Sequence, residues 1–258
     1  MSAGHRPATR AVGFVTPPRW VSPSPVEFAS SVVEPVVAQQ CFPDLPDFGY
    51  TLAEVAAART ACERAAAMLG EAGCAAVAME GTPFAWAGGS GEAGARGRVA
   101  SMADAAGVRA VMAATAIVDG LRALGVERVA LCPTYYPPDW RDAWSGFVAS
   151  CGFDVVYCRT MADQGITSAI DDLDQFGWAT GPDRIVAAIE RCAEVDDTAE
   201  AVVVTGAGCR TTPIIDDLER RAGRPVLGAD GALFWALAQA AGLTLRAGAV
   251  GELTRAAA

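Results

Sequence analysis

Short apolar runs alternate with longer amphipathic stretches along most of the chain. Runs of four to six small or β-branched residues predict buried strands, and an apolar residue every three to four positions predicts helices. We expect strands at 11–16, 74–79, 108–113, 127–132, 153–158, 202–205 and 225–227, and helices at 51–69, 98–106, 115–124, 140–150, 182–193, 212–221 and 232–241. Residues 19–47 are broken by prolines and give no clear element, and the glycine-rich stretch 88–97 predicts a loop. Strands that alternate with helices indicate an α/β fold with largely parallel sheets.

Two strand-to-turn transitions share one pattern. The run Val202–Thr205 leads into Gly206-Ala207-Gly208, and Thr211-Thr212-Pro213 then predicts a helix start with hydroxyl caps. The run Ala75–Met79 leads into Glu80-Gly81-Thr82-Pro83 in the same way. Backbone N–H groups that converge at such a turn, before a helix, favour an anion. The sequence therefore predicts an anion-binding turn in each half of the chain.

The repeated pattern also predicts how the chain is divided. A strand followed by prolines and then a strand followed by glycine occurs twice, at Pro17 and Gly81 and again at Pro133 and Gly206. We expect two pseudo-symmetric Rossmann-like half-domains, 11–115 and 116–228, and leave open a return of residues 229–258 to the first. Ligands in such folds bind beyond the carboxyl ends of the strands, so we expect the site in the cleft between the halves.

Composition narrows the class of protein. The chain has 258 residues, about half of them apolar, and a formal charge of −10, which argues against nucleic acid or anionic membranes as partners. No apolar run reaches the roughly 20 residues that span a bilayer, and the first residues resemble no export signal, so we expect a cytoplasmic protein. Eight scattered cysteines suit a core, and the single histidine, His5, argues against a zinc site. We expect no metal.

Two candidate groups for proton transfer stand at the turns. Glu80 ends an apolar strand, where burial would raise its pKa and suit it to acid–base chemistry; alternatively it pairs with an arginine or faces solvent. Cys209 lies near a helix start, which would lower its pKa if it faced the cleft; it is equally compatible with a buried, inert thiol.

Two further residues are candidates for binding a carboxylate. Tyr135 would donate a hydrogen bond to a developing oxyanion, or its ring would simply fill the core. Its neighbour Tyr136 is expected to point elsewhere. Arg210 would bind a carboxylate or, as we favour, pair with Asp216 or Asp217 on the following helix.

An ordered set of segments carries a family resemblance, although no single one is decisive. It comprises Val12–Pro18, Met79–Thr82, Thr115–Val126, Val129–Tyr135, Leu218–Arg221 with Pro225-Val226, and Phe234-Trp235. In these segments the chain resembles the maleate isomerase and arylmalonate decarboxylase branch of the aspartate/glutamate racemase superfamily, and is most similar to the decarboxylases. The resemblance implies a cofactor-free cleft that holds a small carboxylate between two half-domains. Racemases and isomerases of this group use one cysteine from each half, and the decarboxylases keep only the second.

The resemblance also implies roles for single positions. Thr82 matches a carboxylate-binding threonine, Tyr135 a tyrosine that donates to the carboxylate, and Pro17 and Pro18 prolines at the entrance. Pro83 falls on a serine of the same pocket. At the first cysteine position the chain has Gly81. The second cysteine aligns with Gly206, unless the turn has slipped by three residues and Cys209 replaces it.

These observations lead to three functional hypotheses. The first is a cofactor-independent lyase that decarboxylates a small malonate- or dicarboxylate-type acid through an enediolate. Its candidate residues are Glu80, Tyr135 and Cys209 for catalysis, and Pro17, Pro18, Gly81, Thr82, Pro83, Gly206, Ala207 and Gly208 for binding. The second is an isomerase, racemase or hydrolase that uses Glu80 or Cys209. The third is a carboxylate-binding protein without activity. The oligomeric state does not follow from the sequence.

Overall fold

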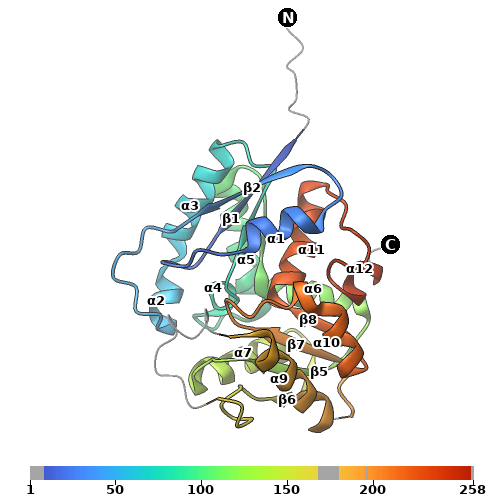
Figure 1. The fold of residues 1–258 in the computed structure, drawn as a ribbon. Helices are drawn as coiled ribbons and strands as arrows, with labels where there is room; N and C mark the ends of the chain where they lie inside the picture. Colours follow the sequence, from blue (N-terminus) through green and yellow to red (C-terminus); the bar gives the residue numbers. More distant parts are fainter. Residues whose placement is uncertain (1–8, 168–179, 196, 257–258) are drawn as a thin grey trace, which may run out of the picture.

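Two four-stranded sheets form the centre of the molecule (Figure 1). The computed structural model describes residues 9–167, 180–195 and 197–256. The first sheet contains β1 (Arg10–Val15), β2 (Val36–Cys41), β3 (Ala76–Met79) and β4 (Arg109–Met112), in the order β2-β1-β3-β4. The second contains β5 (Arg128–Pro133), β6 (Asp154–Cys158), β7 (Ala201–Thr205) and β8 (Val226–Gly228), in the order β6-β5-β7-β8. All neighbouring strands in both sheets are parallel.

Helices connect and cover the strands. They are α1 (Ser24–Ser31), α2 (Leu52–Ala57), α3 (Arg59–Glu71), α4 (Pro83–Trp86), α5 (Gly91–Ala106), α6 (Ala113–Leu124), α7 (Pro138–Ser150), α9 (Pro182–Val195), the 3-10 turn η1 (Thr212–Ile214), α10 (Ile215–Ala222), α11 (Ala229–Ala241) and α12 (Glu252–Ala256). Strands β3 and β7 are buried along their whole length, which explains why both read as unbroken apolar runs.

The predicted α/β fold with two similar halves is confirmed. Each sheet has its first strand second in the order, its second strand at one edge and its third strand next to the first. The carboxyl ends of β1 and β3 in one sheet, and of β5 and β7 in the other, therefore occupy equivalent places. The boundary at residues 115 and 116 stays a prediction.

The C-terminal segment joins the two halves. Helix α11 packs against α6, against β3 and β4 of the first sheet, and against β7 and β8 of the second. Its aromatic residue Phe234 is fully buried and forms edge-to-face contacts with Phe14 of β1 and Phe28 of α1. This helix therefore forms part of the wall between the sheets.

Two local predictions were wrong, and one segment without a predicted element contains a helix and a strand. The expected helix 51–69 is divided at Ala58, although the capping box of Thr51 and Glu54 is present. The expected loop 88–97 is helical from Gly91, where α5 begins. Residues 19–47 contain α1 and the edge strand β2, in which Gln39 and Gln40 cut the apolar run short.

In the part of the chain that the structure describes, no helix is long and apolar enough to cross a bilayer. The same residues contain no group of three or more histidine, cysteine or acidic side chains placed to hold a metal ion. His5 lies outside the described ranges.

Candidate active site

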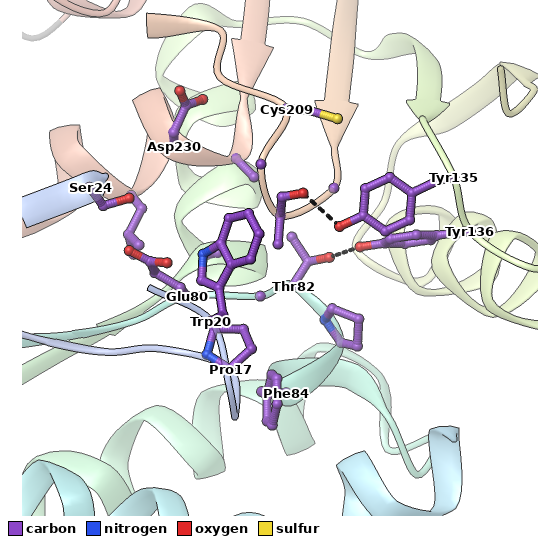
Figure 2. A pocket seen from close by; sticks show the side chains of 18 of the residues that line it. Pro17, Trp20, Ser24, Glu80, Thr82, Phe84, Tyr135, Tyr136, Cys209 and Asp230 are labelled. Atoms are coloured by element: carbon purple, nitrogen blue, oxygen red, sulfur yellow. Dashed lines mark hydrogen bonds between the residues drawn. The ribbon is translucent and has the colours of Figure 1, made fainter. Parts of the chain in front are cut away.

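A cavity of about 170 Å³ opens where the carboxyl ends of the two sheets meet. Figure 2 shows its side chains from both halves of the molecule. Its lining consists of Pro17, Arg19, Trp20, Ser24, Tyr50, Glu80, Gly81, Thr82, Pro83, Phe84, Ala113, Tyr135, Tyr136, Trp140, Gly206, Ala207, Gly208, Cys209, Arg210, Ala229, Asp230 and Leu233. The structure thus brings every expected site residue to one cavity except Pro18. That residue is buried beside it, and its carbonyl accepts a hydrogen bond from the Tyr50 hydroxyl.

Both turns present unused backbone donors to this cavity. Among the described residues, the N–H groups of Gly81, Thr82, Ala207 and Gly208 donate to no acceptor. The chain can turn so tightly because Gly81 and Gly208 have φ angles of 81° and 83°. Four such donors on the two sides of one cavity favour a negatively charged ligand.

Side-chain hydroxyls add donors beside the first turn. The hydroxyls of Thr82 and Tyr136 share a hydrogen bond of 2.5 Å. The pair has two hydroxyl protons and that bond uses one, so the other can go to a ligand or to the nearby side chain of Thr205. Burial raises the pKa of Tyr136 to about 12, which keeps its proton in place at neutral pH. Tyr136, expected to point elsewhere, is therefore a cavity residue.

The Tyr135 hydroxyl donates its proton to another part of the protein. It donates a hydrogen bond of 2.8 Å to the carbonyl of Ala207 in the second turn (Figure 2). Burial raises the pKa of this tyrosine well above its ordinary value. Tyr135 thus supports the turn, and the expected bond to a substrate carboxylate requires that this proton change partner.

Gly206 determines how the second turn is shaped. Its φ angle is 140°, in a region that side chains rarely adopt. A Cβ atom at this position would lie 2.3 Å from Thr134 Oγ1 and 2.7 Å from Tyr135 Cε1. The same atom would lie 3.3 Å from the Cys209 sulfur. The turn therefore has no room for a cysteine at 206, and the thiol of Cys209 reaches the neighbourhood of the missing side chain.

The thiol of Cys209 is held in its protonated form. Its residue is only 5% exposed, and burial raises its pKa to about 11, whereas the sequence suggested a lowered value. Its sulfur lies 3.1 Å from Thr134 Oγ1. Because the single proton of that hydroxyl goes to the Thr205 carbonyl, the thiol must donate this bond.

Asp230 fills the anion site that the helix start was expected to offer. Its carboxylate accepts hydrogen bonds from the N–H and hydroxyl groups of both Thr211 and Thr212, at 2.5–3.0 Å. The two hydroxyls are thus not helix caps. Burial raises the pKa of Asp230, but the charge of Arg210 and these four bonds outweigh it and lower the pKa overall.

Arg210 pairs with other partners than predicted. Its guanidinium binds Glu27 of α1, with Nε 3.0 Å from Oε2, and lies 3.8 Å from Asp230. Asp216 and Asp217 are not its partners. An ion pair from the second turn to α1 connects the two halves beside the cavity.

Glu80 lies at the same side of the cavity as this ion pair. It is 7% exposed, accepts a hydrogen bond of 2.9 Å from Ser22 Oγ and is hydrogen-bonded by the Ser24 side chain. Burial raises its pKa, as expected, more than the serines and the charge of Arg210 lower it. It neither forms a direct ion pair nor faces solvent.

Three residues of the cavity escaped the sequence analysis for different reasons. Ser24 lies in the proline-broken segment where no element was predicted. Tyr136 was set aside because its neighbour matched a known role. Asp230 could have been found, since it follows β8 and the rule that ligands meet the carboxyl ends of parallel strands applies to that strand as well.

The fold and the cavity define a class: an α/β protein of two similar halves with an anion-binding cleft between their strand ends. Comparison with known proteins narrows it. A sequence model of the arylmalonate decarboxylase family matches residues 50–254. The chain belongs to the arylmalonate decarboxylase family. Over 142 residues it is 33% identical to arylmalonate decarboxylase from Bordetella bronchiseptica. The matched residues make up 55% of each chain, so this chain spans about half the length of that curated relative.

Solved structures share the whole fold. An unliganded arylmalonate decarboxylase has a TM-score of 0.75 at 26% identity, with 95% of this chain and 99% of the other covered. The maleate isomerase Iso from Pseudomonas putida S16 has a TM-score of 0.81 at 20% identity, with 96% and 99% covered. A maleate cis-trans isomerase from Nocardia farcinica, solved with a covalently bound succinylcysteine, has a TM-score of 0.77 at 21% identity. The two isomerases are similar in fold.

Proposed function

We propose that this protein is a cofactor-independent decarboxylase of a small malonate-type acid, with Cys209 as the proton donor. The observation that carries the proposal is a protonated, buried thiol beside a cavity lined by unused N–H and hydroxyl donors. Membership of the arylmalonate decarboxylase family supports the reaction type.

In the proposed reaction, the donors hold the carboxylate that is retained. The bond from the α-carbon to the second carboxylate breaks, CO₂ leaves, and the electron pair stays on the substrate as an enediolate. The N–H groups of the two turns and the hydroxyls of Thr82 and Tyr136 stabilise its oxygens, and one such donor is typically worth about 3 kcal/mol. Cys209 gives its proton to the α-carbon, and water then reprotonates the thiolate.

The state of the thiol favours this reaction over the alternatives. An isomerase that attacks the substrate needs a thiolate, and a pKa of about 11 leaves little thiolate at neutral pH. A racemase needs a second acid–base group on the opposite side, where this chain has Gly81. Proton transfer by Glu80 and ligand binding without turnover stay as alternatives to be tested.

A direct assay distinguishes these possibilities. The protein is incubated in D₂O with a set of 2-substituted malonates and with maleate, and CO₂ and the products are measured by NMR. We expect CO₂ release and one deuterium at the α-carbon, with Cys209→Ser at least about 10²-fold slower. Conversion of maleate to fumarate without decarboxylation of any malonate would overturn the proposal in favour of an isomerase. A loss of decarboxylation in Glu80→Gln with full activity in Cys209→Ser would assign the proton to Glu80.

A further inference from the structure

The cavity has two ends of different chemistry. In Figure 2, Thr82, Tyr135 and Tyr136 lie on one side of the Trp20 ring, and Ser24, Glu80 and Asp230 lie on the other. We call the second group, together with Arg210, the acidic end. The first end supplies N–H and O–H donors, which suit carboxylates. The two ends therefore differ in what they can bind.

The acidic end has a negative charge balance. The guanidinium of Arg210 faces two carboxylates, those of Glu27 and Asp230, so the group is net negative before Glu80 is counted. Arg210 is bound to these partners, which offset its positive charge. A substrate with two carboxylates is repelled from this end and would place both at the donor end.

The number of hydrogen bonds that each carboxylate accepts distinguishes Asp230 from Glu80. A carboxylate has about four acceptor sites. Asp230 accepts four hydrogen bonds from Thr211 and Thr212, so its capacity is used. Among the described residues, Glu80 accepts hydrogen bonds from Ser22 and Ser24 alone, although it is as deeply buried. About two acceptor sites of Glu80 stay open to a donor in the cavity.

We infer that the substrate carries a positively charged amino group on its α-substituent, and that Glu80 and Ser24 receive this group at the acidic end of the cavity. This inference rests on the proposed decarboxylation and adds the substrate class. A plain aryl substituent would leave the open acceptor sites of Glu80 buried without a partner, which is costly. An ammonium group fills these sites and favours the charged form of Glu80, against the burial that raises the pKa of this carboxyl. Glu80 is thus a specificity residue rather than the proton donor.

The test compares substituents of nearly equal size. The full chain is assayed with (2-aminoethyl)malonate, n-propylmalonate and phenylmalonate, and kcat/KM is measured for each. We expect the amino compound to exceed the propyl compound by about tenfold or more. Glu80→Gln, which keeps the shape and removes the charge, should abolish that preference, and Glu80→Leu should favour the propyl and phenyl compounds. The exposed Glu71→Gln variant is the control and should keep it.

Each outcome decides one of the two claims. Equal kcat/KM for the amino and propyl compounds, or a preference that survives in Glu80→Gln, overturns the inference and leaves decarboxylation intact. If no malonate releases CO₂, the proposed function fails, and calorimetry with the same three acids then decides the inference alone. In that case tighter binding of the amino compound that is lost in Glu80→Gln supports it, and equal dissociation constants contradict it.

Discussion

The turns after β3 and β7 occupy equivalent places in the two halves but carry different groups. Both follow a fully buried strand, contain a glycine with positive φ and present unused N–H donors to the cavity. The first turn leads directly into α4 through Pro83 and carries Glu80, whose carboxyl lies among serines. The second turn is longer and carries a protonated thiol at Cys209. The two turns thus share a backbone geometry but carry different ionisable side chains.

In the second turn, position 206 has no room for a side chain, but the thiol of Cys209 comes close to the same place. A side chain at Gly206 would collide with Thr134 and Tyr135, while a thiol three residues later lies beside the same point. The first turn carries backbone donors and Glu80, for which we propose a role in the choice of substrate. We therefore expect substitutions in the second turn to affect the proton transfer, and those in the first to affect binding and choice of substrate.

Removal of the thiol is expected to have the largest effect. Cys209→Ala should lower kcat for decarboxylation by about 10²–10⁴-fold, the usual contribution of a positioned acid. The double variant Gly206→Cys, Cys209→Ala should not recover activity, since the Cβ atom at 206 has no room. Steady-state kinetics on the best malonate measures both. Recovery in the double variant would show that the turn can present a thiol from either position.

Removal of a donor near the first turn should have the next largest effect. Tyr136→Phe and Thr82→Val each delete one hydroxyl of the hydrogen-bonded pair and should lower kcat by about 10²-fold. Tyr157→Phe in β6, outside the cavity lining, is a control for loss of a partly buried tyrosine hydroxyl. Unchanged kcat in both site variants would exclude this pair from the reaction.

A stability measurement tests the shape of the second turn. Gly206→Ala introduces the colliding Cβ atom at a φ of 140° and should lower the free energy of unfolding by about 1–3 kcal/mol. Gly146→Ala in α7, where a Cβ meets no atom within 4 Å, should be neutral or stabilising. Urea unfolding of both variants provides the comparison. Equal stability would contradict the turn geometry.

The pH dependence should show the smallest effect. The proton donor must be protonated, and the pKa of Cys209 is raised to about 11, so the rate falls only as pH rises toward that value. Between pH 7 and 9 we expect the rate of decarboxylation to change less than about twofold from this group. A fall centred near pH 8 would indicate an ordinary exposed thiol instead.

The sequence predicted the framework of this site better than its chemistry. Buried strands such as β3 and β7 are continuous apolar runs, and the rule for parallel sheets then places Gly81 and Gly206 at one cleft. Three features of the site depend on contacts between residues 19 to 75 positions apart in the sequence. They are the hydrogen bond from Tyr135 to Ala207, the occupation of the helix start by Asp230 and the raised pKa of Cys209. No local pattern carries that information.

The most direct test of the account is the stereochemistry of proton delivery. Cys209 is the proposed acid on one side of the enediolate, and Gly81 offers no acid–base group on the other. With a malonate that carries two different substituents on its α-carbon, chiral chromatography of the monoacid should therefore show essentially one enantiomer. A racemic product from the wild-type protein would mean that water delivers the proton and would contradict the central role of Cys209.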